Sequence, residues 1–568
     1  MKRQSKAVKN VGVWRLNLVR LMFIALVLAL GWRLADIQIL NTDFLRDQGD
    51  ARHVRKVPVA AHRGMILDRH GEPLAISTPV HSVWLNPQEV SVDHVDLKQL
   101  AQILNIRLGV IQKKIKTNKK REFIYLKRRV KPELAAKVKD LKIAGVALQR
   151  EYKRYYPTGE VASHIVGFTN VDDEGQEGLE LAHDSVLTGV PGLKRMIRDS
   201  RGNYVGGGEQ LKATKAGQNI SLSIDLRLQY LTYQALKSTV NKFQARSGTA
   251  VVLDVKTGEV LAMVNQPSFN PNNRRGLKTS DFRNRAVTDV FEPGSTVKPF
   301  TVAGGLKSGK VTLRSEIDTR PGLFKVSGHT IKDFRDYGKI DLATLIQKSS
   351  NVGASKIALS MDADDLWQSF SAFGMAEATG AYFPGEAMGS MPDPQSWRKL
   401  DRATLAYGYG VATTALQLAR AYTVLANGGI LRPVSFLKTD QIPMGRRVYS
   451  SDVMKQVLTM MESVVKVGGT AQKAAVANYT VAGKTGTIKQ ATLGGYADHH
   501  YLSSFAGIIP AKNPRLAMVV MVDDPQGEHY YGGLIAAPVF AEVMTGAMRL
   551  LNIAPDDLPM NQMQVVQK

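Results

Sequence analysis

The 568-residue chain contains no cysteine. This absence excludes disulfide bonds, thiolate-ligated zinc or haem, and cysteine nucleophiles. Acidic residues are also few, because 50 Asp and Glu stand against 75 Lys and Arg, which gives a formal net charge of +25 at pH 7. An excess of this size suits nucleic acid, an anionic membrane surface or an anionic polymer as a partner. Composition alone does not choose among the three.

Several catalytic signatures are missing as well. The sequence has no G-x-S-x-G elbow, no P-loop and no dinucleotide-binding fingerprint. His499, His500 and His529 lie in polar segments without the spacing of metal ligands, so we expect no metal site and no cofactor. The length predicts two to four domains.

The N-terminus carries a charge-free apolar run at residues 21–32. Six basic residues precede it and no acidic residue occurs before Asp36, an asymmetry that predicts a cytoplasmic N-terminus with the bulk of the chain outside. Because the run is shorter than the roughly 20 residues that a bilayer core requires, a span must extend at both ends. The alternative is a signal peptide cleaved near the small residues at 29–31, and both interpretations export the protein.

The composition and the hydrophobic pattern of the sequence change near residue 215. Before that point, polar turns and basic residues predict an extended, mixed α/β module. Within it, residues 107–142 hold 14 Lys or Arg against three acids, which indicates a solvated helical surface or contact with anionic lipid or wall polymer. An exported chain is not expected to bind nucleic acid.

After that point, residues 248–265 and 501–524 each read as a β-hairpin, with mainly helical sequence between them. This order predicts one antiparallel sheet covered by helices, an α+β fold. We expect four segments: a cytoplasmic tail and transmembrane anchor at 1–40, a pedestal at 41–215, a catalytic domain at 216–560 and a tail at 561–568.

Three short motifs follow one another in the expected catalytic domain. They are Ser295-Thr296-Val297-Lys298, Ser349-Ser350-Asn351 and Lys484-Thr485-Gly486-Thr487. Each alone is weak, because S-x-x-K pairs and K-T-G turns occur by chance. Pro293-Gly294 predicts a tight turn before Ser295, which would cap a helix, while Pro299 confines the motif to a helix start or a distorted turn.

The first two motifs together can make a nucleophile. A serine hydroxyl needs a base, and Lys298, on the same helical face as Ser295, is the titratable neighbour that the local sequence fixes. Its ordinary pKa of about 10.4 is too high for a base, but burial and a second cation, Lys484, would lower it. Asn351 can hydrogen-bond to Lys298 and to a substrate amide, and Ser349 can relay a proton.

The third motif can bind substrate. The segment reads as the start of a β-strand leading into a hydrophilic loop, on which Gly486 would let a substrate backbone approach closely. Thr485 and Thr487, with Lys484, could hold a carboxylate. The backbone N–H groups of Ser295 and Thr487 would then stabilise an oxyanion.

The three-motif logic is shared by β-lactamases and penicillin-binding proteins. The chain resembles the class B penicillin-binding proteins, specifically the FtsI-type division branch, over nearly its whole length. The resemblance lies in residues 62–75, 150–168 and 174–192 of the pedestal, and in 285–299, 345–358, 406–422 and 481–487 of the catalytic domain. An elongation-branch enzyme usually carries an acidic residue where Asn351 stands.

The resemblance implies a serine-type D-Ala-D-Ala transpeptidase. Ser295 would be acylated, Lys298 would be its base, and Ser349, Asn351 and Lys484 would complete the proton network. Thr485, Gly486 and Thr487 would bind the donor stem peptide, Tyr409 and Tyr531 would form cleft walls, and residues 63–71 would be structural.

The resemblance also implies which partners the protein has and where in the cell it lies. The partners would be peptidoglycan stem peptides, lipid-linked precursor strands, β-lactam antibiotics, the membrane and divisome proteins including a septal glycosyltransferase. The protein would be a single-pass inner-membrane protein at the division septum, with a periplasmic catalytic domain. The alternatives are a β-lactam sensor or β-lactamase-like enzyme, which should lack so long a pedestal, and a noncatalytic divisome scaffold, which an intact S-x-x-K motif disfavours.

Overall fold

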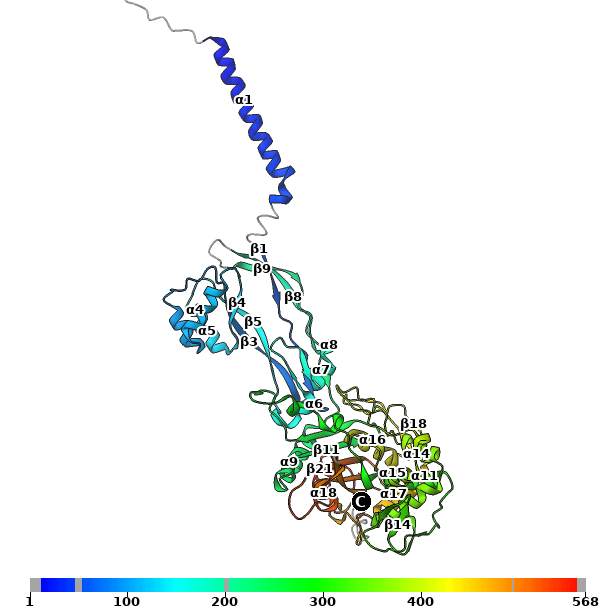
Figure 1. The fold of residues 1–568 in the computed structure, drawn as a ribbon. Coiled ribbons are helices and arrows are strands. Elements are labelled where there is room, and N and C mark those ends of the chain that lie inside the picture. The colour runs from blue at the N-terminus through cyan, green and yellow to red at the C-terminus, as the bar shows by residue number, and fades with distance from the viewer. Residues whose placement is uncertain (1–11, 46–53, 199–203, 493–494, 559–568) are drawn as a thin grey trace, which may run out of the picture. The chain divides into compact units, whose positions relative to one another are not determined.

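The structure, a computed structural model, describes residues 12–45, 54–198, 204–492 and 495–558. By their internal packing these residues fall into two units (Figure 1). The first takes its described residues from 12–61, 79–152 and 190–215, and the second from 62–78, 153–189 and 216–558.

The N-terminal helix α1, Val13–Ala35, continues through a π-helical turn, Asp36–Leu40. None of its residues is buried, and an 18-residue window within the 28-residue segment has a mean hydropathy of 2.0, which makes the segment long and apolar enough to cross a membrane. At 1.5 Å per residue, α1 alone spans about 35 Å. The helix extends beyond residues 21–32 at both ends, as the predicted span requires, while the span itself stays a prediction.

The first unit holds a three-stranded antiparallel sheet of order β1-β8-β9 and a helical layer with its own apolar core. The sheet strands are β1 Val54–Val59, β8 Gly192–Arg198 and β9 Tyr204–Lys212. The layer comprises α3 Leu97–Leu104, α4 Leu108–Thr117 and α5 Pro132–Asp140 with β4 Ile124–Val130, which pairs with the end of β3 Pro73–Leu85. Ile111 and Ile115, four residues apart on α4, are fully buried in this core, as an amphipathic helix requires.

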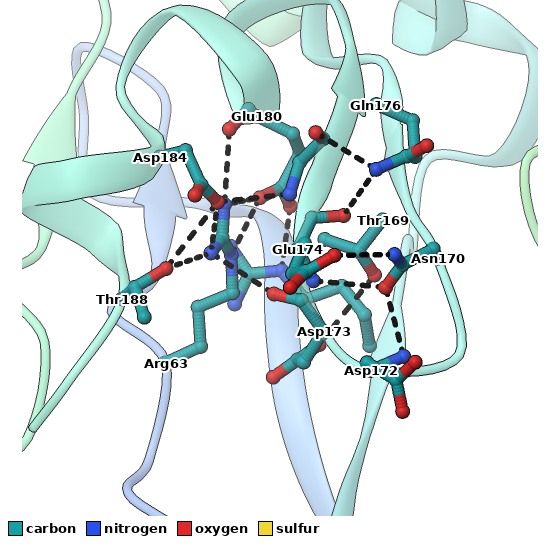
Figure 2. A network of polar contacts seen from close by, with 12 residues as sticks. Arg63, Thr169, Asn170, Asp172, Asp173, Glu174, Gln176, Glu180, Asp184 and Thr188 are labelled. Carbon is teal, nitrogen blue, oxygen red and sulfur yellow. Dashed lines mark hydrogen bonds and ion pairs between the residues drawn. The ribbon is translucent and has the colours of Figure 1, made fainter. Parts of the chain in front are cut away.

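The pedestal part of the second unit is centred on Arg63, as Figure 2 shows. Its guanidinium donates to Glu180 Oε2 at 2.8 Å and to Asp184 Oδ1 at 2.7 Å, while Arg154 donates to the other Glu180 oxygen at 2.6 Å. Arg63, Arg154 and Glu180 are all buried, so each charge is compensated by its partners rather than by water. The Arg63 contacts join segments more than 110 residues apart and give Arg63 a structural role.

The surrounding short elements complete this part. They are β2 Ile66–Leu67, the end of β5 Val146–Tyr155, α6 Ser163–Val166, β6 Phe168–Thr169, β7 Gly175–Glu177, α7 Gly178–Ala182, α8 Asp184–Leu187 and β10 Ile220–Ser221, with a 3₁₀ turn at Gly159–Ala162.

The larger part of the second unit is built on one five-stranded antiparallel sheet of order β12-β11-β21-β20-β19. The strands are β11 Ser247–Asp254, β12 Val260–Gln266, β19 Ala482–Thr492, β20 Gly495–Ile509 and β21 Leu516–Asp523. Both predicted hairpins are present, as β11–β12 and β20–β21, and so is the predicted single sheet. The α+β fold class is confirmed.

Helices cover the sheet on both faces, since β11 and β21 are buried along almost their whole length. Helix α9, Leu226–Lys242, packs with α18, Gly532–Leu550, while α16, Ala415–Ala426, packs against β11 and β21. The other helices are α10 Arg285–Thr288, α11 Lys298–Lys307, α12 Leu342–Lys348, α13 Asn351–Ser360, α14 Ala363–Ala372, α15 Lys399–Leu405 and α17 Ser451–Glu462. Four short strands form two hairpin-like pairs, β13 Ile317–Asp318 with β16 Lys339–Ile340 and β14 Leu323–Val326 with β15 His329–Lys332; β17 Ile430–Leu431 pairs with β18 Arg446–Arg447.

Candidate active site

Ser295 lies in a single 3₁₀ turn, Gly294–Val297, that leads directly into α11. The prediction that Ser295 caps this helix is wrong, because α11 begins at Lys298 and its capping residue is Val297. The extra turn has a chemical consequence. Within the described part of the chain the half-buried Ser295 hydroxyl makes no structural hydrogen bond, so it is available to react.

Glycine allows three backbone segments to meet at this turn. A Cβ atom on Gly408 would lie 2.2 Å from the carbonyl oxygen of Gly294, and one on Gly486 would lie 3.1 Å from the Thr296 methyl carbon. The turn is fixed from behind, because the Tyr422 hydroxyl donates to the carbonyl oxygen of Thr296 at 2.8 Å. Strand β19 therefore lies against the turn that carries the candidate nucleophile.

The Lys298 side chain is fully buried and ends among three oxygen atoms. Its Nζ donates to the Ser349 carbonyl at 2.6 Å, to Ser349 Oγ at 3.0 Å and to Asn351 Oδ1 at 2.7 Å. The first residue of α11 thus meets the junction of α12 and α13, which brings the first two motifs together. The predicted hydrogen bond between Lys298 and Asn351 is present.

Lys484 enters the same cluster from β19. Its Nζ donates to Ser349 Oγ at 3.0 Å and to the Thr485 carbonyl at 3.1 Å, and its side chain is fully buried. The Ser349 hydroxyl therefore lies within hydrogen-bond distance of both lysine nitrogens. This is the position that a proton relay between them requires.

Burial controls the charge of both lysines. It lowers the pKa of Lys484 to about 7. Burial, and next the nearby Lys484 cation, hold the pKa of Lys298 well below its usual value, while the Asp333 carboxylate acts in the opposite direction. A lysine of depressed pKa is able to accept a proton from a serine near neutral pH.

The junction between α12 and α13 depends on backbone geometry that the sequence did not reveal. Ser349 ends α12 in the left-handed conformation, with φ of +60°, and Ser350 caps α13 by accepting from Gly353 N at 2.8 Å. Asp333, after β15, holds the start of α13. Its carboxylate accepts from Ser350 Oγ at 2.6 Å and from Asn351 N at 2.5 Å.

Strand β19 presents the third motif at the edge of the sheet. Edge position leaves alternate backbone N–H and C=O groups of the strand unpaired on the side away from β20. Thr485 Oγ1 lies 3.0 Å from Thr470 Oγ1, and Thr487 Oγ1 accepts from Gly532 N at 3.1 Å. The predicted strand is present, and it continues past the motif to Thr492, so the hydrophilic loop expected after the motif does not begin at Thr487.

The two tyrosines that were predicted to form cleft walls, Tyr409 and Tyr531, lie close to β19. Tyr409 is half-buried against Tyr407, and its hydroxyl hydrogen-bonds to the backbone of Lys489, at the far end of the third motif. Tyr531 is 46 % exposed and packs on Tyr530 immediately before Gly532. Both tyrosines therefore contact or adjoin β19, while their contact with a substrate stays a prediction.

Sequence reasoning did not find Asp333, Thr470 or Tyr422. The sequence carries no local signal for the first two, because each acts on a segment that only the fold brings near. Tyr422 belongs to segment 406–422, which carried the resemblance but no assigned role.

The cluster matches a known family. Residues 248–545 match the family described as the penicillin-binding protein transpeptidase domain, and residues 58–222 match the penicillin-binding protein dimerisation domain. The chain is similar to proteins named peptidoglycan D,D-transpeptidase FtsI from Escherichia coli, at 44% identity over 98% of this chain and 95% of the relative, and probable peptidoglycan D,D-transpeptidase PbpC from Pseudomonas aeruginosa, at 39% identity over 96% of each.

Solved structures agree with the sequence comparison. A peptidoglycan synthetase from Bifidobacterium adolescentis matches 89% of this chain and 98% of its own at 27% identity and a TM-score of 0.71. The transpeptidase domain of Burkholderia pseudomallei penicillin-binding protein 3 matches 60% of this chain and 98% of its own, at 42% identity and a TM-score of 0.55. The chain therefore belongs to the class B penicillin-binding proteins of the FtsI type.

Proposed function

We propose that this protein is a peptidoglycan D,D-transpeptidase that cross-links stem peptides through an acyl-enzyme on Ser295. The observation that carries the proposal is the buried Lys298, whose ammonium nitrogen is hydrogen-bonded to Ser349 and Asn351 and whose pKa is depressed by burial and by Lys484.

In the first half-reaction, the Ser295 oxygen attacks the carbonyl carbon of the D-Ala-D-Ala amide while its proton passes to Lys298. The carbonyl oxygen becomes an oxyanion, which the backbone N–H groups of Ser295 and Thr487 stabilise. Collapse breaks the amide C–N bond, and the departing D-Ala nitrogen receives a proton from the lysine pair through Ser349. The ester on Ser295 remains.

In the second half-reaction, an amine of another stem peptide attacks the ester carbonyl, loses a proton to the same network and releases Ser295. Thr485 and Thr487, with Lys484, hold the terminal carboxylate of the donor, and Gly486 lets its backbone lie along the edge of β19. A β-lactam mimics the donor and leaves a slowly released acyl group on Ser295. Asn351 hydrogen-bonds to the donor amide.

Intact-protein mass spectrometry after incubation with benzylpenicillin tests the assignment. We expect one penicilloyl adduct on the wild type and on Ser396→Ala, an exposed serine outside the site, and none on Ser295→Ala. A folded Ser295→Ala protein that still gains a single adduct would place the nucleophile elsewhere. Rapid loss of the adduct by hydrolysis would instead favour a β-lactamase-like enzyme.

The apolar α1 supports a membrane setting. We propose that it is an uncleaved single-pass anchor in the inner membrane, with a cytoplasmic N-terminus and a periplasmic catalytic domain at the septum, beside divisome proteins that include a glycosyltransferase. Tethering raises the local concentration of the enzyme next to such partners. A chain beginning at residue 45 should bind penicillin without supporting division. N-terminal sequencing that finds a mature chain starting after Gly31 would contradict the anchor.

A further inference from the structure

Much of the protein's positive charge is concentrated in one short segment of the first unit. Residues 107–142 carry 14 Lys or Arg and three acidic residues, a net charge of +11 out of +25 for the whole chain. A concentration of this kind raises the local potential and attracts anions. The catalytic chemistry described above uses none of these residues.

Several of these basic residues lie on α4, which is labelled in Figure 1, and in the turn that follows it. We define this basic α4 surface as Arg107, Lys113, Lys116, Lys119, Lys120 and Arg121. All six side chains are exposed, and none has an ion-pair or hydrogen-bond partner among the residues that the structure describes. Their charges are therefore not committed to holding the fold together.

Neighbouring basic residues behave differently. Lys114 donates to the Tyr125 carbonyl at 2.8 Å, Lys127 donates to the Leu104 carbonyl at 2.5 Å, and Arg128 pairs with Glu151 at 3.2 Å. These three side chains stabilise the helical layer. The contrast separates structural cations from those that face solvent without a partner.

The surface is hollowed along the helix. A shallow open groove of about 730 Å³ lies against one side of α4, and its lining comes from this helix and its two flanking residues alone: Arg107, Gly109, Val110, Lys113, Lys114, Thr117 and Asn118. Val110 is 38 % exposed there, so the groove offers apolar contact between flanking cations. An extended ligand with alternating apolar and anionic groups matches this lining.

An aromatic ring continues the surface beyond the basic turn. Phe123 follows Arg121 by two residues and is 41 % exposed. Its ring is 4.9 Å from that of Trp84 and 4.8 Å from that of Tyr125, which holds it in place on strand neighbours. A partly exposed ring, fixed on one side, offers a flat apolar surface to a ligand.

We propose that the basic α4 surface binds a strand of peptidoglycan away from the catalytic cleft. The lysine and arginine side chains meet stem-peptide carboxylates, which recur along the polymer, and Phe123 packs against the apolar face of a sugar ring. This proposal rests on the proposed function, because it supplies a second contact for the same substrate polymer. Repeated contacts of modest strength along one strand keep the enzyme on its polymer between catalytic events.

The groove and the ring favour a polymer strand over a lipid surface. An anionic bilayer would engage the exposed lysines through charge alone. A glycan strand carrying short peptides is narrow, and it offers both carboxylates and sugar faces to such a groove.

Co-sedimentation of the full-length protein with purified peptidoglycan sacculi tests the proposal. The protein is kept in detergent and first acylated with benzylpenicillin, so that the catalytic cleft is blocked. We expect Lys116→Glu/Lys119→Glu/Lys120→Glu to weaken binding at least tenfold. A control with the same charge change, Lys310→Glu/Lys399→Glu/Lys438→Glu, replaces three exposed lysines of the second unit and should bind like the wild type. Phe123→Leu, which keeps an apolar side chain, should weaken binding severalfold.

Two further measurements decide the ligand chemistry. Sacculi whose carboxyl groups have been amidated should bind at least tenfold more weakly than untreated sacculi, and added salt should weaken binding to untreated sacculi. Equal binding of the triple variant and the control would overturn the proposal. So would equal binding of amidated sacculi, or a triple-variant defect seen only with phosphatidylglycerol vesicles, which would assign the surface to lipid. The extent of penicillin acylation, measured on the same samples, reports separately on the proposed function.

Discussion

The two buried lysines give a quantitative prediction about the base. Lys298 Nζ and Lys484 Nζ each lie 3.0 Å from Ser349 Oγ, so twice that distance, about 6 Å, is the largest separation possible between them. At an effective dielectric constant of about 20, two unit charges at that separation repel by about 2.8 kcal/mol, which corresponds to about two pKa units. Lys484→Met keeps most of the side-chain volume and removes this repulsion.

We therefore expect the pKa of Lys298 to rise in Lys484→Met, because the ammonium form is no longer opposed by a second cation. The base is active only when it is unprotonated, so the acid limb of the pH profile should move to higher pH by about two units. The measurement is the second-order rate constant for acylation by a fluorescent penicillin between pH 5 and pH 10. Loss of the carboxylate-binding cation will also lower the rate overall, but a uniform decrease does not move the limb.

The position of the acid limb decides the matter. An unchanged limb, or a shift to lower pH, would show that Lys484 does not control the charge of the base. Lys473→Met serves as the control, because this lysine is exposed and lies outside the cluster. Its acid limb should coincide with that of the wild type.

Two further substitutions test the supports of the site. Asp333→Asn removes the carboxylate that raises the pKa of Lys298, so its acid limb should move to lower pH, opposite to Lys484→Met; a shift to higher pH would contradict the electrostatic role. Arg63→Met leaves the buried Glu180 with Arg154 as its remaining cation and should cost about 3–5 kcal/mol of unfolding free energy, measured by denaturant titration, while penicillin acylation at low temperature persists. Wild-type stability in Arg63→Met would show that the network contributes little.

The sheet could be predicted from the sequence because its signals are local. The runs 248–265 and 501–524 combine β-branched residues with turn residues at their centres, and each folds as an antiparallel pair. Helix α9 carries an equally local signal, because Leu228, Ala235 and Leu236 repeat at helical spacing and are buried. The place of β19 at the edge of this sheet was not predicted.

For Ser349, the sequence predicted which groups should interact but not how they are arranged. A serine needs a base, and a lysine base needs burial and a second cation, which directed attention to Lys298 and Lys484. Geometry decides the rest. The left-handed backbone of Ser349 turns its carbonyl and hydroxyl oxygens toward Lys298, and no residue pattern distinguishes a serine in this conformation from one in a helix.

Asp333 shows most clearly what could not be predicted from the sequence. Its carboxylate caps α13 from a loop that is 17 residues away along the chain, whereas the recognisable capping signal is local and belongs to Ser350. The sequence also did not reveal that each unit is assembled from separate stretches of the chain, because residues 62–78 and 153–189 pack with segments far along the chain. The boundary at residue 215 and the catalytic roles of the motif residues stay predictions.

The partners of the two ammonium groups link the base to the substrate. Within the described structure, the atoms that hydrogen-bond to Lys298 Nζ and Lys484 Nζ are neutral oxygens of Ser349, Asn351 and Thr485. Neutral oxygens stabilise a buried cation less than a carboxylate does, and Asp333, the nearby anion, is already hydrogen-bonded to the start of α13. The two lysines together therefore lack one compensating negative charge, which favours loss of a proton from the pair when no substrate is bound. A donor that brings a carboxylate to Lys484 supplies that charge, so Lys484 remains protonated on substrate binding and Lys298 is left as the base.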